Sequence, residues 1–564
     1  MTFATAKFRA LLPAATFAML AEFLMGVSDM AVAGHLLGET SLASLNLLQP
    51  VFNIVSFLAL MVGTGASVLF STAIGEFRER RAHEFFTQGF YSAVGLGALL
   101  LLALLFGLPA LLALAGASGE VTENALVYGR WFLPCAVLEP LFVFLSGMCY
   151  SDGDGRINLF AYGTQLVSNF LLSVPLTLGC GLAGCAAASV LGHGLAIGVL
   201  CGHFLRKGNN LRFVRHFSFR ETLRICWCAA GDASLKLCYA VLFFLLNVYV
   251  VHRFGTATLP ILAVTVTVLG LAEIFDGVGK AVQPLASVYI GERNDRRTRS
   301  VMNTALLVAL AESLLVTMAL MLAPGLVTGL VGLSDPALKP AAETAVRLAS
   351  LGLVATAVMM LFNSYYTFIA REGLAALLST VTMFAVPVAL VPPCGSAWGE
   401  NGVWLALGLA PVLSVVGLSA AVCLKEGRAR FPYLLDPSRR ERIRVFDLTL
   451  DPVSVCSASA GVAAHLKACG QADALATRAA LLVEETLMVV HNRNGGDRIM
   501  AEATVDLNDG PTLVLRDDGT IFDLTDADAR ISSLRSYLVS NLMTAIPNRR
   551  NLTTTGFNRN VFKL

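Results

Sequence analysis

Two acidic side chains stand inside the first apolar segment of this 564-residue chain. Glu22 and Asp29 are seven residues apart, so two helical turns would place them on one face, about 10 Å apart along the axis. An ionisable side chain at the centre of a bilayer costs roughly 2.5–3.5 kcal/mol or more. Burial favours the protonated form of a carboxylate, and a nearby cation favours the ionised form. A carboxylate poised between these forms can exchange a proton for another cation, which is the chemistry of an antiporter.

A second group of charged residues lies in a later apolar segment, AEIFDGVGK. Glu273, Asp276 and Lys280 are spaced by three and four residues, which places them on one helix face. We expect Asp276 and Lys280 to neutralise each other, which leaves Glu273, with Asp276 beside it, as a candidate for cation coupling. Asp232 and Lys236 repeat the four-residue spacing and are expected to form a structural pair.

Other polar residues of the apolar segments are candidates for lining a substrate cavity. They are Asn169, Glu139, Glu312 and Lys280. Neither glutamate has an evident partner in the sequence.

The composition implies two different surroundings for the chain. Hydrophobic residues make up 56% of it, and the mean hydropathy is +0.69. Of the 80 charged residues, 34 follow Lys425. Before that point only about a tenth of the residues are charged, against about 25% in an average soluble protein. We therefore expect lipid around the first part and water around the tail, and the net charge of +2 gives no reason to expect a nucleic acid partner.

The first 425 residues contain apolar runs of the length that a membrane-spanning helix needs, about 20 residues. Twelve such runs begin near Leu11, Leu48, Phe90, Ala125, Leu159, Cys185, Cys226, Thr258, Asn303, Ala342, Ala376 and Val403. Alternate connecting loops hold fifteen Lys and Arg residues, whereas the opposite loops hold only Arg253 and Lys339. Short loops rich in Lys and Arg stay in the cytoplasm, so we expect both termini there.

The chain repeats itself. STAIGEFRERRA and SVYIGERNDRR both end an apolar run with Ile-Gly-Glu and a basic cluster, and Gly75 and Gly291 are 216 residues apart. LLGETSLASL is echoed by RFGTATLPIL, with Gly38 and Gly255 217 apart. The sequence thus predicts an all-α polytopic protein with twelve spans in two six-helix lobes, residues 1–217 and 218–425. Parallel halves of this kind suit a transporter that rocks two bundles about a central site.

The two halves resemble the MATE (multidrug and toxic compound extrusion) antiporters. The resemblance covers about residues 8–425, and its carriers are VSDMAVAGHLLGETSLASL, GTGASVLFSTAIGE, GDGRINLF and QPLASVYIGERNDRR. It implies two six-helix lobes around a V-shaped cavity, and cation-coupled export of organic, often cationic, compounds. It also implies a functional role for Asp29 and matches Asn169 to a family asparagine. Ser173 stands in the region where many relatives carry an acidic residue.

The tail differs in pattern from the rest of the chain. Residues 426–445 are basic and are expected to form a linker beside the membrane, where anionic lipid attracts such a segment. From Phe446 onward, two amphipathic helices are followed by the alternating segments RIMAEATVDL and TLVLRDD, a helix near 532–544 and a last strand near 557–564. Residues 446–564 are therefore predicted to form one α+β domain.

This tail resembles the GHKL ATPase fold, especially the anti-sigma-factor serine kinases. The carriers are LLVEETLMVVHN, DDGTIFD and TTGFNRNVFKL. The resemblance implies an acidic helix residue at Glu484 or Glu485. It implies an adenine-contacting Asp-x-Gly motif at Asp517 or Asp518 with Gly519. A simple turn is the alternative for the last three residues.

Two parts of the GHKL pattern are missing. Val489 stands where the family has its metal-binding Asn, and Ser532 and Ser533 stand where a glycine-rich lid is expected. Without them, phosphoryl transfer lacks its electrostatic clamp. We therefore expect a degenerate regulatory or protein-binding domain, for which ATP is doubtful as a ligand.

The leading prediction is a bacterial inner-membrane antiporter rather than an enzyme. It would use H⁺ or Na⁺ as coupling ion, require no cofactor, export small organic cations and contact a cytoplasmic regulatory protein through residues 446–564. One alternative is a lipid-linked saccharide flippase of the same superfamily, which would favour a basic cavity. Another is a membrane-anchored ATP-binding sensor or kinase.

Overall fold

The structure is a computed structural model that describes most of the chain. It describes residues 2–520 and 550–564, apart from 39–40, 42–43, 46–47, 77, 115–119, 207–208, 256–257, 332–335, 437–438, 440, 496–497 and 555–556. The segment 521–549 includes the predicted helix near 532–544 and the expected lid position, so these two predictions lie outside the described residues.

Long helices make up the first half of the chain. They are α1 (Phe3–Leu37), α3 (Gln49–Gly75), α4 (Glu79–Leu114), α5 (Glu120–Phe132), α6 (Cys135–Ser151), α7 (Gly155–Cys180) and α8 (Leu182–Cys201). The short helices η1 (Gly202–Leu205) and α9 (Phe219–Cys228) belong to the connection to the second half.

The second half repeats this plan with more breaks. Its elements are α10 (Ala230–Phe254), α11 (Leu259–Gly270), η3 (Leu271–Phe275), α12 (Asp276–Gly291), α13 (Asp295–Leu322), α14 (Gly325–Val331), α15 (Lys339–Ser350), α16 (Leu353–Phe368), α17 (Glu372–Thr380), the π-helix η4 (Val381–Ala385) and α18 (Val386–Glu426).

The same residue type ends a helix at matching points of the two halves. Gly38 follows α1 with a φ of 86°, and Gly255, 217 residues later, follows α10 with a φ of 87°. This left-handed conformation closes a helix and favours glycine. The repeated glycine therefore ends the first long helix of each half in the same way.

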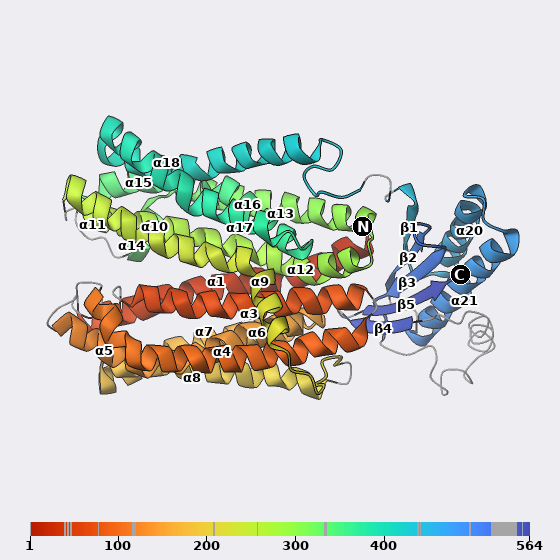
Figure 1. Cartoon of the computed structure of the whole chain (residues 1–564), viewed down its shortest axis with the longest axis horizontal. Coiled ribbons are helices and arrows are strands. Elements are labelled where there is room, and N and C mark those ends of the chain that lie inside the picture. The colour runs from red at the N-terminus through yellow and green to blue at the C-terminus, as the bar shows by residue number, and fades with distance from the viewer. Residues whose placement is uncertain are drawn as a thin grey trace.

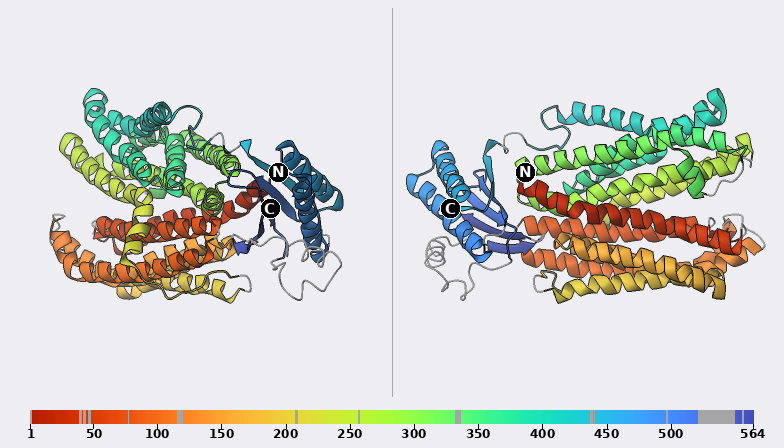
Figure 2. Two further views of the ribbon diagram at one scale, coloured as in Figure 1. Left: turned by 45° about the vertical axis from the view of Figure 1, so that its right-hand side comes forward. Right: turned by 180° about the vertical axis from the view of Figure 1, so that it is seen from behind.

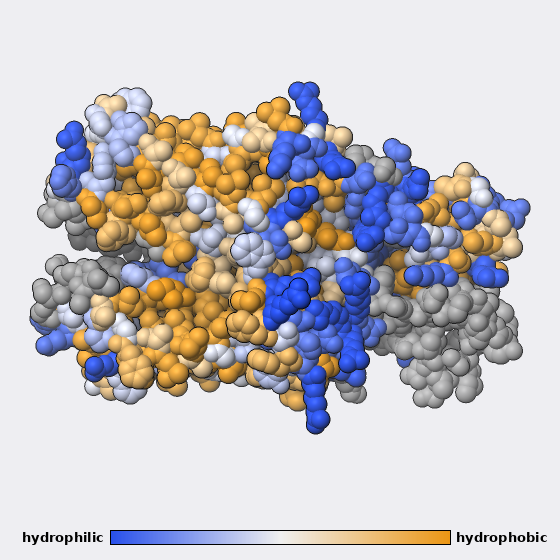
Figure 3. All heavy atoms as spheres, in the orientation of Figure 1, coloured by the Kyte–Doolittle hydropathy of each residue, from blue (hydrophilic) through white to orange (hydrophobic). Residues whose placement is uncertain are grey.

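The helices form two layers that run side by side along the bundle, one from each half of the chain (Figure 1). Apolar residues cover most of the visible helical face, and hydrophilic residues gather where the helices meet the C-terminal domain (Figure 3). Among the described residues, nine helices are long and apolar enough to cross a membrane, or up to eleven if each of two bent pairs is one span. The bent pairs, α5 with α6 at 47° and α15 with α16 at 42°, occupy matching places in the repeats.

The predicted spans near Ala376 and Val403 lie in one helical run that is kinked in the middle. This run, Glu372–Glu426, is 55 residues long. Trp398 and Gly399 depart from helical torsion angles inside it, and Gly399 has a φ of 63°. The chain therefore changes direction at this point.

The two halves touch at the end of the bundle that carries the C-terminal domain, which we call the domain end. A Cβ added to Gly75 would lie 2.4 Å from the carbonyl oxygen of Val288 and 2.8 Å from the Cα of Gly291. Nearby, Gln283 Nε2 donates a hydrogen bond of 2.5 Å to Ser67 Oγ. The repeated Ile-Gly-Glu glycines thus meet each other, and their lack of a side chain lets α3 and α12 approach closely.

The C-terminal domain is an antiparallel sheet with two helices on one face (Figures 1 and 2). The strands β1 (Ile443–Thr449), β2 (Met500–Asp506), β3 (Thr512–Asp517), β4 (Arg550–Thr554) and β5 (Phe557–Lys563) are ordered β1-β2-β3-β5-β4. The helices α20 (Pro452–Ala468) and α21 (Asp473–Arg493) pack their apolar residues on Ala501, Ala503 and Leu515. The opposite face of the sheet lies against the domain end.

Most predicted elements of the tail are confirmed, and one boundary is wrong. The predicted helices correspond to α20 and α21, and the predicted strands to β2, β3 and β5. Strand β1 begins at Ile443, inside the range 426–445 that was predicted to be a linker. Its charged residues hide its strand character: Arg444 is exposed, and Asp447 pairs with Arg297 of the helical bundle.

Candidate functional site

Asp29 lies at the centre of a polar cluster inside the first half. Its Oδ2 accepts a hydrogen bond of 2.9 Å from Ser189 Oγ on α8. Ser189 Oγ in turn accepts one of 3.0 Å from Asn169 Nδ2 on α7. The Oδ1 atom of Asp29 is buried and has no hydrogen-bond partner among the described residues. The carboxylate is therefore held in place through one oxygen while the other can still accept a proton or a cation.

Helix α7 presents a buried polar stripe on the face that carries Asn169. Gln165, Asn169, Ser173 and Thr177 are four residues apart and buried, so they lie one above another. Each has a side-chain oxygen without a hydrogen-bond partner in the described part of the chain. Hard cations are held by oxygen ligands of this kind. The donor set around Asn169 and Asp29 thus suits a proton or a small cation such as Na⁺.

A second polar region lies between the two halves. It is a pocket with an empty volume of about 550 Å³ that includes open solvent, lined by Met19, Glu22, Leu60, Leu235, Lys236, Glu273, Asp276, Lys280, Met360 and Asn363. These residues come from α1 and α3 of the first half and from α10, η3, α12 and α16 of the second. The predicted charged residues of the two halves thus meet across one space.

The charges in this inter-lobe pocket are mostly paired. Lys236 Nζ donates a hydrogen bond of 2.6 Å to Glu273 Oε1, and Lys280 lies 3.4 Å from Asp276 Oδ2. The second pair was predicted from the sequence and is confirmed. Within the described chain, Glu22 makes no ion pair or hydrogen bond. The three carboxylates and two lysines leave one net negative charge, and it falls on Glu22.

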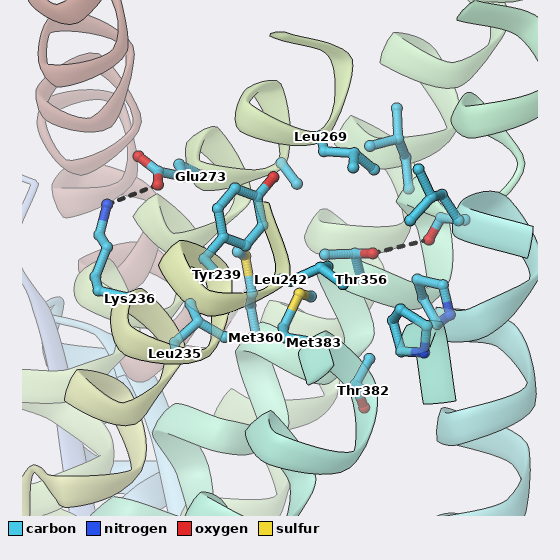
Figure 4. Close-up of a pocket in the computed structure, with 16 residues that line it drawn as sticks. Leu235, Lys236, Tyr239, Leu242, Leu269, Glu273, Thr356, Met360, Thr382 and Met383 are labelled. Carbon is cyan, nitrogen blue, oxygen red and sulfur yellow. Dashed lines mark hydrogen bonds and ion pairs between the residues drawn. The ribbon is translucent and has the colours of Figure 1, made fainter. Parts of the chain in front are cut away.

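The Lys236–Glu273 pair lines both the inter-lobe pocket and a more apolar pocket of the second half, which Figure 4 shows. The figure shows Lys236 reaching toward Glu273, with Tyr239, Met360 and Met383 beside them. This pocket has an empty volume of about 620 Å³ including open solvent, and leucine, methionine, tyrosine and proline side chains dominate its lining. Together the two pockets place an apolar wall beside a polar wall that carries one net negative charge.

The structure adds neighbours to the predicted site. Glu22 and Asp29 both lie on α1, where Glu22 lines the inter-lobe pocket and Asp29 contacts Ser189 of α8. Lys236 pairs with Glu273. The side chain of Asp232, its predicted partner, lies outside the described residues.

The two remaining glutamates have different surroundings. Glu139 on α6 accepts a hydrogen bond of 2.6 Å from Ser56 Oγ on α3. Glu312 on α13 is half-buried, and its Oε2 has no hydrogen-bond partner in the described part of the chain. It lies in neither of the pockets described above. Ser189, which contacts Asp29, was missed as a site residue because nothing in the local sequence marks it. Lys236 was expected in a structural pair only, and its contact with Glu273 was not predicted.

The nucleotide-like positions of the tail have structural partners. Asp517 is buried, and its Oδ1 accepts hydrogen bonds from Asn558 Nδ2 at 2.8 Å and from the backbone N–H of Gly519 at 3.2 Å. Asp518 accepts a hydrogen bond of 2.7 Å from the N–H of Met500 and lies 3.4 Å from Lys7. Asp517 and Gly519 therefore keep the Asp-x-Gly spacing, whereas Asp518 ties the tail to α1. Glu484 and Glu485 lie on α21, partly buried.

Burial makes Asp517 sensitive to pH. It raises the pKa of the Asp517 carboxyl from 3.8 to about 7. The folded domain therefore keeps this proton up to about pH 7, whereas the unfolded chain loses it near pH 4. The free energy of unfolding of the domain therefore falls as the pH rises from about 4 to 7, and above pH 7 it stays below its value at pH 4.

We expect Asp517→Asn to stabilise the domain at pH 8 by up to about 4 kcal/mol and to have no such effect at pH 4. Hydrogen exchange of the β3 and β5 peptides in the full chain, compared with wild type at each pH, measures this. Asp473→Asn, which removes an exposed carboxylate, is the matched control. Equal protection of the Asp517→Asn variant and wild type at pH 8 would contradict the prediction.

The fold and the site define a multi-pass membrane transporter built from two related helical halves. The MatE family model matches residues 14–175 and 233–394, one segment in each half and more than half of the chain. The chain belongs to the MATE family of membrane transporters. The double match confirms the repeat predicted from the sequence.

Solved structures show the same fold. A MATE protein in complex with MaL6 has 20% identity and a TM-score of 0.70, with 75% of this chain and 96% of that chain covered. An outward-facing multidrug resistance MATE family transporter of the MOP superfamily has 21% identity and a TM-score of 0.69, with coverages of 74% and 95%. A MOP superfamily transporter from Pyrococcus furiosus, for which reverse polarity of the binding pocket suggests a different function, has 20% identity and a TM-score of 0.67, with coverages of 75% and 96%. Among curated proteins, the comparison found no match to this sequence.

Proposed function

We propose that this protein exchanges H⁺ or Na⁺ for small organic cations across a bacterial inner membrane. One observation carries the proposal. Asp29 Oδ2 is held by Ser189, which in turn is held by Asn169. Asp29 Oδ1 and the side-chain oxygens of the α7 stripe are buried and lack hydrogen-bond partners among the described residues. A buried carboxylate with neighbouring oxygen ligands can alternate between a protonated and a cation-bound form, which couples ion movement to transport.

The pockets support a cationic, partly apolar substrate. Each of the two lysines of the inter-lobe pocket lies within 3.4 Å of a carboxylate, so the net charge of this pocket is negative and lies on Glu22. The neighbouring pocket is lined mainly by apolar side chains. Glu22 would attract the charge of the substrate while the apolar wall receives its rings or alkyl groups. A lipid-linked saccharide with an anionic head group would meet a repelling charge here.

Twelve membrane passes with both termini in the cytoplasm fit the chain best. A continuous helix of 55 residues would be about 80 Å long, more than twice the apolar thickness of a bilayer. We infer that Glu372–Glu426 crosses twice, turning at Trp398 and Gly399. The Arg-rich loops lie at the domain end together with the C-terminal domain, and Lys and Arg favour the cytoplasmic side.

The C-terminal domain has a regulatory rather than an enzymatic role in this proposal. Its order of elements, with a helix carrying Glu484 and Glu485 and an Asp-x-Gly turn at Asp517 and Gly519, supports a degenerate GHKL-like domain. Val489 in place of the metal-binding asparagine disfavours ATP hydrolysis. The transport step forms no covalent bond and needs no cofactor beyond the coupling ion.

Vesicles containing the purified protein test the function directly. A proton gradient and a sodium gradient are imposed in separate experiments. We expect one of them to raise the rate of ethidium transport about tenfold, since coupling energies of 1–3 kcal/mol correspond to changes of about 5–150-fold. The gradient that drives transport identifies the ion, and an ionophore that dissipates it serves as the control. Transport of ethidium and related cations that responds to neither gradient would overturn the proposal.

A further inference from the structure

A row of charged side chains crosses the sheet face that points toward the helices. The strand register pairs Asp447 with Glu502, Glu502 with Arg516, and Arg516 with Arg559. These four residues therefore lie side by side on β1, β2, β3 and β5, and we call them the interface row. The Glu502, Arg516 and Arg559 side chains are at most 1% exposed. Charges buried this deeply need partners.

Their partners come from the second half of the helical bundle. Glu292, directly after α12, forms ion pairs with Arg516 and, at 2.8 Å, with Arg559. Arg297 in the first turn of α13 pairs with Glu502 at 2.7 Å and with Asp447. Together with the interface row they make three carboxylates and three guanidinium groups, and the network as a whole is neutral. The sheet and the helices each contribute equal numbers of both signs, so separation would leave each side neutral but would break every ion pair between them.

The same network also reaches the first half. Arg559 Nη2 donates a hydrogen bond of 2.6 Å to the carbonyl oxygen of Ile74, in the last turn of α3, where helix carbonyls need partners. The backbone N–H of Phe3 donates to Asp447 Oδ1 at 2.9 Å, and the Phe3 ring packs edge-on against Phe557. Arg559 thus binds the end of α3 with one nitrogen and Glu292 with another.

The bridged point is also the place where the two halves meet. Ile74 and Glu292 are the direct neighbours of Gly75 and Gly291, which pack backbone against backbone. The sheet lies against this end of the helices (Figures 1 and 2), and Arg559 contacts Ile74 and Glu292 there. Separation of the halves at the domain end would pull the two partners of Arg559 apart.

We propose that the C-terminal domain is a clamp that holds the two halves together at the domain end, and that this end opens only after the interface row has left it. Removing one partner from a buried charge network strongly destabilises the state in which the sheet contacts the helices, because the remaining charge is then buried without an opposite charge beside it. Release exposes both sides to water, where each charge is solvated. The domain would therefore set the fraction of molecules open at this end, and a partner that captures the freed sheet would raise it.

A distance measurement tests the clamp without relying on transport. Spin labels on unnatural amino acids replace Arg80 and Arg371, which are exposed at the domain ends of the first and second halves. We expect one short distance in the otherwise wild-type chain. Glu292→Gln, and separately Arg559→Gln, should add a longer distance, with the open-to-closed ratio rising about tenfold or more. Failure of the cation-coupling proposal would not affect this readout.

Arg293→Ala is the matched control, because Arg293 is the neighbour of Glu292 and its ion pair with Asp509 at the same interface is largely exposed. It should leave the distances unchanged. Wild-type distances in both Glu292→Gln and Arg559→Gln would overturn the proposal. Loss of the folded protein in both variants, with Arg293→Ala intact, would also overturn it, because the network would then serve folding rather than a contact that can open.

Discussion

Asp29→Asn is expected to reduce gradient-driven efflux about 100-fold, close to the upper end of ordinary coupling energies between sites. Asparagine has the same shape and can still accept the hydrogen bond from Ser189, so the α1–α8 contact persists. It cannot take up a proton or balance the charge of a cation. Efflux of ethidium from vesicles under the driving gradient, with protein amounts matched, measures the loss.

Glu312→Gln is the matched control for this variant. It also removes a carboxylate from an apolar helix, but Glu312 lies outside the Asp29 cluster and outside the two pockets, so efflux should stay near wild type. Ser189→Ala should have an intermediate effect, because it removes the hydrogen bond to Asp29 Oδ2 but keeps the charge of the carboxylate. Gradient-driven efflux of the Asp29→Asn variant at the wild-type rate would remove Asp29 from the mechanism.

Gly291→Ala is expected to prevent the two halves from closing at the domain end. The added Cβ would lie 2.4 Å from the carbonyl oxygen of Thr72 and 2.8 Å from the Cα of Gly75. Both are backbone atoms of α3, so relief requires the helices to move apart. Alternating access needs both ends to close in turn. We therefore expect transport to fall by at least about tenfold, with a longer distance between labels at positions 80 and 371.

The control for this substitution is Gly107→Ala in α4. A Cβ there meets nothing within 4 Å, and alanine favours a helix by about 1 kcal/mol relative to glycine, so transport should be unchanged. Ethidium binding by the Gly291→Ala variant would show that its fold persists. Transport by this variant at the wild-type rate would mean that the close approach of α3 and α12 is not needed for the cycle.

Local sequence patterns predicted the parts of the fold that depend on short-range physics. Gly38 and Gly255 end equivalent helices because both positions need a left-handed backbone, and a repeated glycine signals such a need without any knowledge of tertiary contacts. The Asp276–Lys280 pair depends only on helical spacing. The repeat itself follows from residues at a nearly constant offset, and the double family match confirms it.

Contacts between distant segments could not be predicted in the same way. Ser189 is 160 residues from Asp29, and an isolated serine in an apolar helix gives no sign of its partner. Lys236 pairs with Glu273, 37 residues away, and this contact depends on how α10 and η3 pack in the whole lobe; its predicted pairing with Asp232 stays a prediction, because that side chain lies outside the described residues. Strand β1 resembled a linker because it is rich in charge, and the partners of Asp447, Arg297 and the N–H of Phe3, come from distant segments.

The meeting of Gly75 with Gly291 has an evolutionary consequence. Equivalent positions of two repeats can touch only close to the axis that relates them, so in an ancestral assembly of two identical halves this glycine would have contacted its own copy. The acidic neighbours of the two glycines differ in their partners: Glu292 holds two arginines of the C-terminal domain, whereas Glu76 pairs with the exposed Arg78. A contact that is symmetric in its two glycines thus holds the C-terminal domain through the acidic residue of one half only.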